Sequence, residues 1–318
     1  MSDWRPGTDR VALEARASML VQVRAFFADR GVLEVDTPVL GATGVTDPAI
    51  ECVRTRDGQV LQSSPEYFMK RLLAAGSGPI YQVARAFRAE EAGRLHNPEF
   101  LLLEWYRPGF DDVALMDEID ALLGPLLPGF PAWRLPFRDV LGQRLGVDPL
   151  LAPADELAAA LTRHFTQAGR EADVAALTGG ERTALLDLAY AEAIDGWPGA
   201  LFVHDFPPQQ AALARLREDP QGETVAARFE LVVDGIELAN GYHELGDAAE
   251  QRRRFEADRA RRRAAGRLAP DVDEHLLAAL AAGLPDCAGV ALGLDRVLLL
   301  RSGATDLDAV MPFSRSRL

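Results

Sequence analysis

Two neighbouring segments of the chain alternate large apolar side chains with small or polar ones, which is the period of a β-strand. Residues 80–88 form the first segment, residues 100–106 form the second, and a polar loop joins them. One face of the predicted hairpin is apolar. The other face gathers an aromatic ring, a carboxylate and a phenol beside Arg88, whose guanidinium can bind a phosphate or a carboxylate through two hydrogen bonds. This second face therefore predicts a binding site.

The N-terminal region predicts a helix followed by a short strand. Asp9 can cap the helix, apolar residues recur at helical spacing, and Gly31 ends it. Residues 32–35 then predict a strand that leads into Pro38. Because the order of helix, strand and proline occurs in many α/β domains, it carries weight only together with other signals.

A second helix is predicted to start near residue 64. Ser64 stands at its cap and Pro65 in its first turn, which are favoured positions for these residue types. Glu66 lies in the same turn, where the helix dipole stabilises an acidic side chain by roughly 0.3–1 kcal/mol. That effect alone is enough to explain many such glutamates.

The middle of the chain predicts helices that proline and glycine clusters interrupt. Residues 113–123 and 181–194 repeat apolar positions at helical spacing. We predict a mostly helical insertion over residues 136–197 and a strand at residues 201–206 that returns to the sheet. No pattern in this part of the chain carries catalytic chemistry.

Residues 228–244 predict a second hairpin around an Asp-Gly turn. Its second strand holds Glu237, Asn240 and Glu244, which do not share one alternation phase. A bulge or bend at Gly241 would point all three side chains inward. Buried polar groups are costly unless they are paired or bind a metal, so this strand predicts a functional role.

Near the C-terminus the pattern predicts a strand at residues 288–291, a tight turn at Gly293 and a helix at residues 294–300. Arg296 falls in the first turn of this helix. A helix N-terminus already favours an anion, and an arginine there strengthens the preference for a nucleotide phosphate.

Composition limits the classes of partner. The 318 residues carry 34 basic and 48 acidic side chains, so the net charge is −14 and no basic arm offers a nucleic-acid surface. The arginine-rich segment of residues 247–265 also contains interleaved acids and is typical of a solvated helix. Cys52 and Cys287 are too few for a disulfide framework and favour a reducing compartment. With no signal peptide and no long apolar run, we expect a cytoplasmic protein that does not bind membranes.

Several of these segments resemble the motifs of class II aminoacyl-tRNA synthetases in their lysyl form. Three segments resemble the second motif: Phe-Arg-x-Glu, His-Asn-Pro-Glu-Phe and Leu-Glu-Trp-Tyr. One segment resembles the third motif, Gly-Val-Ala-Leu-Gly-Leu-Asp-Arg. The N-terminal helix and strand resemble the first motif, a dimer interface in that family. The resemblance implies an α+β fold, a class II catalytic domain whose antiparallel β-sheet is flanked by helices, and it covers residues 1–318 as a single domain.

The resemblance also implies roles for individual residues. Catalysis is implied for Arg88, Glu237 and Arg296. Binding of ATP is implied for Arg88, Ala89, Glu90, His96, Asn97, Phe100, Glu237, Leu238, Gly293 and Arg296. Binding of the amino acid is implied for Ser64, Pro65, Glu66, Tyr106, Asn240, Glu244 and Ala291. The cofactor Mg²⁺ would be held by Glu237, together with Glu244.

The segment that resembles the first motif starts at Asp9. Lysyl-tRNA synthetases, in contrast, carry an anticodon-binding barrel ahead of this motif. The chain therefore resembles the truncated lysyl paralogues that modify translation elongation factor P, and we expect no anticodon-binding domain. The resemblance implies ATP-dependent activation of (R)-β-lysine and its transfer to a lysine ε-amine of elongation factor P. It further implies a homodimer that uses (R)-β-lysine or lysine and does not bind tRNA stably.

Two other functions stay open from the sequence. The chain could acylate tRNA or another small carrier, or it could be a regulatory paralogue without activity. Against the second, both motif arginines and the expected acids are present. One departure from the lysyl pattern is Ala291, which stands where glycine is usual and which we expect to favour a β-amino over an α-amino group.

Overall fold

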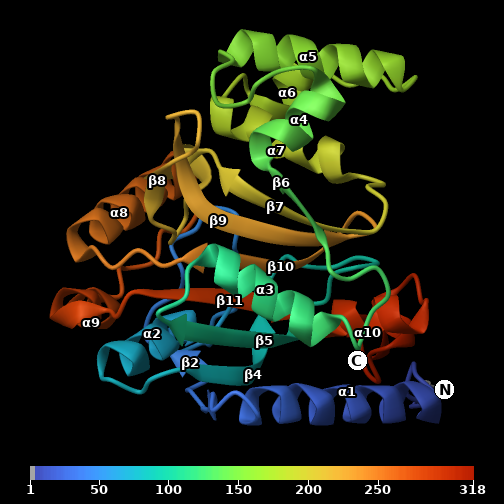
Figure 1. The fold of residues 1–318 in the computed structure, drawn as a ribbon, viewed down its shortest axis with the longest axis vertical. Helices are drawn as coiled ribbons and strands as arrows, with labels where there is room; N and C mark the ends of the chain where they lie inside the picture. Colours follow the sequence, from blue (N-terminus) through green and yellow to red (C-terminus); the bar gives the residue numbers. More distant parts are fainter. Residues whose placement is uncertain (1–3) are drawn as a thin grey trace. The chain divides into compact units, whose positions relative to one another are not determined.

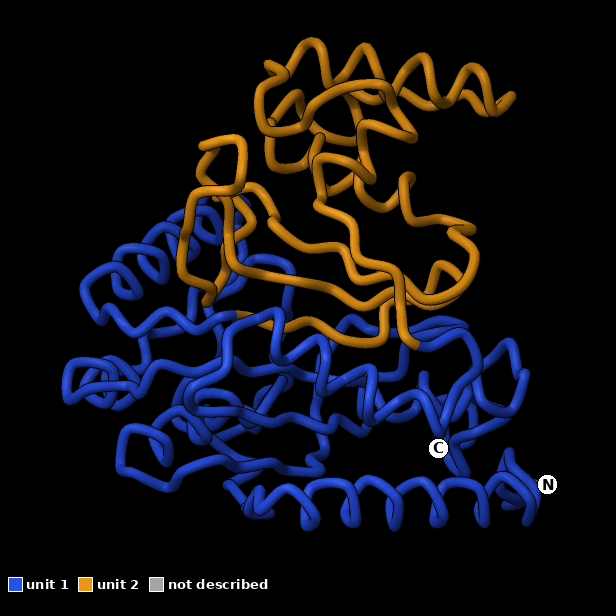
Figure 2. Tube along the Cα trace, viewed as in Figure 1, with its two compact units in different colours: residues 1–130, 243–318 blue, residues 131–242 orange. Residues whose placement is uncertain are grey.

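The structure, a computed structural model, describes residues 4–318. The chain divides into two compact units (Figure 2). Unit 1 combines residues up to Phe130 with His243–Leu318, and unit 2 comprises Pro131–Tyr242. Each unit has its own strands and helices, and each is described by itself below.

Unit 1 is built on the strand order β1-β4-β5-β11. These strands span Leu33–Glu34, Ile80–Phe87, Glu99–Pro108 and Cys287–Gly293. The pair β1 and β4 is parallel, whereas β4–β5 and β5–β11 are antiparallel. The predicted hairpin and the predicted C-terminal strand are thus confirmed. Two short strands, β2 (Leu40–Gly41) and β3 (Val60–Leu61), pair separately.

The helices of unit 1 include one that the sequence pattern did not predict, α9. Their bounds are Arg10–Ala28 for α1, Glu66–Ala74 for α2, Asp112–Leu123 for α3, Ala248–Ala264 for α8, Glu274–Gly283 for α9 and Leu294–Ser302 for α10, with short 3₁₀ turns η2 (Leu307–Ala309) and η3 (Arg315–Arg317). As predicted, Asp9 caps α1, because its carboxylate accepts the Ala12 N–H at 2.9 Å.

The apolar face of the β4–β5 hairpin packs on α1 and α3. The Phe27 ring stacks on Tyr81 at 4.4 Å and meets Trp105 edge-on at 5.4 Å. The Trp105 indole N–H donates to the Glu118 carboxylate on α3 at 3.0 Å, which satisfies its one donor inside the core. These contacts occupy one face of the sheet, and the opposite face carries the polar residues that the sequence singled out.

Unit 2 has the strand order β10-β9-β7-β6, and β8 pairs with β9. In chain order its strands are β6 (Trp133–Pro136), β7 (Ala200–Phe206), β8 (Leu216–Glu218), β9 (Thr224–Val233) and β10 (Ile236–His243). The β6–β7 pair is parallel, and β7–β9 and β9–β10 are antiparallel. The predicted strand at residues 201–206 and the Asp-Gly hairpin are confirmed. Asp234 and Gly235 both have positive φ, at 49° and 77°, as this turn requires.

Residues 137–194 form the helices of unit 2, which pack together (Figure 1). Their bounds are α4 (Phe137–Leu145), α5 (Ala154–Gln167), α6 (Val174–Thr178) and α7 (Arg182–Ile194), and the 3₁₀ turn η1 spans Pro208–Gln210. The rings of Phe137, Tyr190 and Phe206 lie 5.0–5.3 Å apart and centre a buried apolar cluster. Across residues 4–318 no helix is long and apolar enough to span a bilayer.

The bulge predicted in β10 exists, but its predicted position at Gly241 is wrong. The register shifts between Glu237 and Ala239, whereas Gly241 pairs regularly with Phe229. A Cβ at Gly241 would lie 2.3 Å from the Phe229 ring, so this glycine makes room for a core side chain. The inserted residue, Leu238, changes the alternation phase ahead of Ala239.

Candidate active site

The polar face of the unit 1 sheet is built from cross-strand pairs of β5 and β11. Glu104 lies directly opposite Ala291, and Tyr106 lies directly opposite Gly289. Directly opposed residues of antiparallel strands point to the same face. Ala291 and Glu104 therefore lie side by side on this face, and the predicted effect of Ala291 on substrate choice stays a prediction.

Ser64 and Tyr106 hold the Glu104 carboxyl group between them. The Ser64 hydroxyl donates to one oxygen at 2.6 Å, and the Tyr106 hydroxyl donates to the other at 2.8 Å. Ser64 Oγ also accepts the Glu66 N–H at 3.0 Å. The helix begins at Glu66 with Pro65 as its cap residue, one position later than predicted, yet Ser64 still serves the first turn. Glu104 is a member of this cluster that the residue-by-residue prediction missed.

The same cluster contains a buried lysine. The Nζ atom of Lys70 lies 2.6 Å from Glu66 Oε1 and 2.6 Å from Glu244 Oε2. The side chains of Lys70 and Glu244 are each only 1% exposed. Because Glu66 lies on α2 and Glu244 follows β10, the lysine joins two distant parts of the sequence. Sequence reasoning did not assign Lys70 a role.

Burial and like charge shift the titration of this cluster. Burial, reinforced by the nearby Glu66 charge, raises the pKa of Glu104 to about 8, although its hydrogen bonds with Ser64 and Tyr106 oppose the shift. Burial alone would lower the pKa of Lys70, but the Glu244 and Glu66 carboxylates outweigh it and raise the pKa. The cluster thus contains an acid that holds its proton more tightly than an ordinary glutamate, beside a permanent ammonium.

Gly289 is required by the space that the cluster occupies. A Cβ at this position would lie 2.3 Å from the Tyr106 ring and 2.6 Å from Glu244 Oε1. Such contacts are impossible without displacing one of these side chains. Gly289 was not predicted as a site residue, and a glycine inside a strand pattern is the signal that could have found it.

The predicted nucleotide residues of β4 and β5 are also brought together. The Arg88 guanidinium carbon lies 5.1 Å from the centre of the Phe100 ring, and Nη1 donates to Glu91 at 3.0 Å. The Ala89 N–H donates to the Glu51 carbonyl at 2.8 Å, which anchors the start of the loop. Arg88 is partly exposed, with 29% of its side chain accessible. It can therefore meet an anionic ligand while its ring partner stays in place.

The loop residues between these strands have unequal surroundings. Asn97 is buried, and its amide donates to the Glu99 carbonyl at 2.6 Å and accepts the Arg315 N–H at 2.9 Å. Glu90 is exposed and accepts a hydrogen bond from Arg267 at 2.9 Å. His96 is exposed at the loop tip. Asn97 therefore has a clear role in shaping the loop, and ATP contacts by these residues stay a prediction.

Helix α10 begins after Gly293, close to its predicted start, and its first turn is tied to this loop. Arg296 Nε donates to the Leu95 carbonyl at 3.2 Å. The preceding residue, Asp295, is buried, accepts the Leu101 N–H at 2.7 Å and pairs with Arg16 on α1. Gly293 itself pairs with Leu102, so the helix N-terminus continues directly from the site face of the sheet.

In unit 2 the β10 bulge places Glu237 and Asn240 on one face. Glu237 pairs with Val232 and Asn240 pairs with Glu230, and Val232 and Glu230 share a face of β9. Leu238, at the bulge, is buried. The offset of one residue removes the phase conflict that the sequence alone displayed.

Glu230 is a buried acid that the sequence analysis did not select. Burial, followed by the neighbouring Glu237, raises the pKa of Glu230 to about 7. The Arg228 guanidinium forms an ion pair with Glu230 and donates to Asn240 Oδ1 at 3.2 Å. In the sequence, Glu230 is a single acid inside an apolar strand. Such a position predicts a buried carboxyl group, which is costly unless it is paired, and this is the signal that could have marked Glu230.

The possible metal ligands follow from this arrangement. Within residues 4–318, no group of three or more His, Cys, Asp or Glu side chains is arranged to hold a metal. Mg²⁺ commonly uses one or two carboxylates and completes its shell with water and substrate phosphates. Glu237 and Glu230, two interacting carboxylates in unit 2, fit that donor set. Glu244 lies in unit 1 and is bound to Lys70, so its predicted part in the metal site stays untested.

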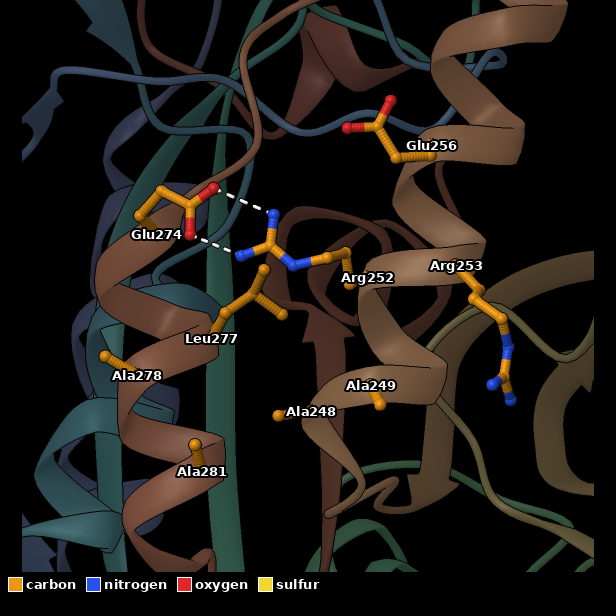
Figure 3. A pocket seen from close by; sticks show the side chains of 9 residues that line it. All are labelled: Ala248, Ala249, Arg252, Arg253, Glu256, Glu274, Leu277, Ala278 and Ala281. Carbon is orange, nitrogen blue, oxygen red and sulfur yellow. Dashed lines mark hydrogen bonds and ion pairs between the residues drawn. The ribbon is translucent and has the colours of Figure 1, made fainter.

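A groove of about 760 Å³ lies elsewhere in unit 1, between α8 and α9 (Figure 3). Alanines line much of it, and the Arg252–Glu274 ion pair crosses it at 2.5 Å. None of the predicted site residues lines this groove. Its lining residues include no buried polar side chain, so we keep the candidate site on the sheet face.

Known proteins are similar to this chain along its whole length. A family model described as tRNA synthetases class II (D, K and N) matches residues 2–134 and 160–317. A protein of Edwardsiella ictaluri named "Elongation factor P--(R)-beta-lysine ligase" is 46% identical over 100% of this chain and 99% of its own length. Proteins with the same name from Vibrio cholerae and Salmonella arizonae are 46% and 43% identical, over 99% of this chain and 99% and 98% of their own lengths.

Proposed function

The chain belongs to the class II tRNA synthetase family, and from this premise we propose that it is an ATP-dependent ligase that attaches (R)-β-lysine to a lysine side chain of elongation factor P. The observation that carries the proposal is the buried cluster on the sheet face of unit 1. It offers the acidic side chains of Glu66, Glu104 and Glu244 around the single Lys70 ammonium. A ligand ammonium beside Glu104 would favour the ionised form of that acid, so an amino acid with two ammonium groups matches the charge of the cluster.

The first step of the proposed reaction is activation of the amino acid. Its carboxylate oxygen attacks the α-phosphorus of ATP, the bond to the bridging oxygen breaks, and pyrophosphate leaves with that electron pair. Arg88, whose guanidinium lies over the Phe100 ring, neutralises charge on the reacting groups. We assign binding of the adenine to Phe100 and Arg296. The product is an aminoacyl adenylate.

The second step is transfer. The uncharged ε-amine of the acceptor lysine attacks the acyl carbon, AMP leaves, and the nitrogen loses a proton to give an amide. No covalent enzyme intermediate is needed, which agrees with the two cysteines being buried thiols. The acidic cluster around Lys70 binds and orients the amino acid in both steps.

Mg²⁺ fits the donor set in unit 2. We propose that Glu237 and Glu230 hold it, in place of a pair formed by Glu237 with Glu244. When bound, Mg²⁺ would supply charge neutralisation for the phosphates of ATP. The ion pair between Arg228 and Glu230 keeps Glu230 oriented across the strand from Asn240.

The proposal predicts one specific product. Elongation factor P incubated with the enzyme, ATP and (R)-β-lysine should gain the mass of one β-lysyl group on a single lysine, as intact-mass and peptide mass spectrometry would measure. A parallel incubation with tRNA tests the alternative carrier. Acylated tRNA together with unmodified elongation factor P would overturn the proposed acceptor but keep the enzyme class.

We also propose a homodimer formed through α1 and the strand that follows it. Val11 and Val21 on α1 are 71% and 67% exposed, and Leu33 on β1 is 59% exposed. Exposed apolar side chains grouped on two consecutive elements are typical of a surface that a partner covers. Light scattering at micromolar concentration should give twice the chain mass, and a fully active monomer would contradict the dimer.

A further inference from the structure

Lys70 is the only lysine in the chain, and it is buried at the substrate end of unit 1. Its position on α2 places Nζ 2.6 Å from Glu66 on the same helix and 2.6 Å from Glu244. Neither the family membership nor the relatives' names assign it a role. The proposed reaction does not use its amine as a nucleophile or a base.

A buried ammonium is an expensive way to fill a core position. Taking a lysine and two carboxylates out of water carries a desolvation penalty, and well-packed apolar side chains often stabilise a protein as well or better. The packing around α2 is otherwise apolar, because Met69, Leu73 and Ile80 form a buried cluster beside it. Stability alone therefore does not account for a charge at this position.

What the ammonium does is fix the distance between two carboxylates. Glu66 and Glu244 each place one oxygen on the same nitrogen atom, so neither can move without losing that contact. Without the cation, their mutual repulsion would drive them apart or make one take up a proton. The remaining oxygen of Glu244 lies beside Gly289 and the Tyr106 ring, toward the face that carries Glu104.

We propose that Lys70 is a positioning residue that acts through Glu66 and Glu244 and sets the spacing of amino groups that the substrate must present. The inference rests on the proposed function, in which these carboxylates bind the substrate amines. Lys70 then determines which diamino acids fit: lysine and (R)-β-lysine are accepted, and ornithine, whose side chain is one methylene shorter, is discriminated against.

The test uses Lys70→Met, which keeps the length of the side chain and removes its charge. Amino-acid-dependent pyrophosphate exchange gives kcat and KM for (R)-β-lysine, lysine and ornithine, and active-site titration corrects kcat for unfolded protein. We expect KM for the preferred amino acid to rise about tenfold or more while corrected kcat stays within about threefold, since the loss is in binding geometry. We expect the preference over ornithine to fall by about tenfold.

Two further variants separate positioning from stability. Leu73→Ala, on the same helix and 2% exposed, should lower the melting temperature without changing the preference over ornithine. Lys70→Arg keeps the charge and should recover part of the lost affinity. If Lys70→Met does not fold, Lys70→Arg decides, because its longer, planar head must shift the preference while KM for ATP stays constant.

The outcomes are distinguishable. An unchanged preference in Lys70→Met, or the same change in Leu73→Ala, would overturn the positioning role while leaving the proposed function intact. Wild-type enzyme that gives no exchange with (R)-β-lysine or lysine would instead refute the proposed function. In that case binding of the diamino acids without ATP, measured by calorimetry on wild type and Lys70→Met, still decides whether Lys70 sets ligand spacing.

Discussion

In each unit a cation holds the acidic side chains of the candidate site, but the two groups are assembled differently. In unit 1, Lys70 joins Glu66 to Glu244, a residue far away in the sequence. In unit 2, Arg228 pairs with Glu230 two residues away on the same strand and with Asn240 across the hairpin. The unit 2 cluster therefore depends on strand register, whereas the unit 1 cluster depends on the packing of several elements.

The difference matches the tasks that we propose. The unit 1 cluster is proposed to bind amines, a task that calls for acids at a fixed spacing and for polar neighbours such as Ser64 and Tyr106. The unit 2 cluster is proposed to bind a metal, a task that calls for two interacting carboxylates, here Glu230 and Glu237 on a hairpin of regular strands. Functional sites on regular strands are held more firmly than sites on loops.

The largest effect should come from Arg88, which belongs to neither cluster and which we propose to neutralise charge at the α-phosphate of ATP. Arg88→Ala should lower pyrophosphate exchange by about a thousandfold or more, because uncompensated phosphate charge in a closed site costs several kcal/mol. Arg85→Ala, three residues earlier on β4 and with an exposed side chain, is the matched control and should stay close to wild type. Arg88→Ala activity within about tenfold of wild type at saturating substrates would refute its role.

If the two clusters bind different ligands, a substitution in one should weaken Mg²⁺ binding and a substitution in the other should weaken amino-acid binding. Glu230→Gln should weaken apparent Mg²⁺ affinity by about a hundredfold with little change in KM for the amino acid, since it removes a proposed metal ligand. Glu104→Gln should do the reverse, raising KM for the amino acid by about tenfold at an unchanged Mg²⁺ optimum. Titrating exchange activity against Mg²⁺ and against amino acid measures both. Equal effects of the two variants on both curves would show that the clusters do not divide the work.

Two glycines give a sharper, smaller contrast. A methyl group at Gly289 would meet Tyr106 and Glu244, so Gly289→Ala should raise KM for the amino acid. A methyl at Gly241 would meet the buried Phe229 ring, so Gly241→Ala should instead cost about 1–3 kcal/mol of unfolding free energy. Gly142→Ala, with open space around its position, is the control for both. Chemical denaturation and exchange kinetics on the three variants measure both quantities. A loss of stability without a rise in KM for Gly289→Ala, or the opposite for Gly241→Ala, would contradict the contrast.

The raised pKa of Glu104 predicts a pH dependence of stability. A carboxyl group whose folded-state pKa of about 8 exceeds its ordinary value of 4.5 binds more protons in the folded state. The free energy of unfolding should therefore fall as pH rises from about 5 to 8 and level off above that range. Glu104→Gln should flatten part of this slope, as denaturation at several pH values would measure. Identical slopes in both proteins would mean that Glu104 is ionised throughout.

The sequence pattern predicted local structure better than the assembly of either cluster. The β4–β5 hairpin follows from alternation, and the cap at Asp9 follows from side-chain chemistry, since both depend on neighbours in sequence. Lys70 was missed because its two partners come together only in the folded unit. The bulge was misplaced because a glycine within a strand has two common causes, a bend of the backbone or a neighbouring side chain that leaves no room for a Cβ. The sequence does not distinguish them, and at Gly241 the cause is the Phe229 ring.

The smallest expected effect concerns Ala291, opposite Glu104 on β11. Its methyl group lies on the same face as the acidic cluster around Lys70. Ala291→Gly should therefore remove volume beside the carbon atoms that carry the amino groups of the substrate. A methyl-sized change alters discrimination by about 1–3 kcal/mol, and the added room should favour an α-amino group over a β-amino group one carbon further out. We therefore expect kcat/KM for lysine to rise about tenfold relative to (R)-β-lysine. Ala288→Gly, opposite Arg107 on the other face, should lower stability without changing that ratio. If the ratio is unchanged in Ala291→Gly too, Ala291 is a packing residue and selectivity for the β-amino group depends on Ser64 and Glu66.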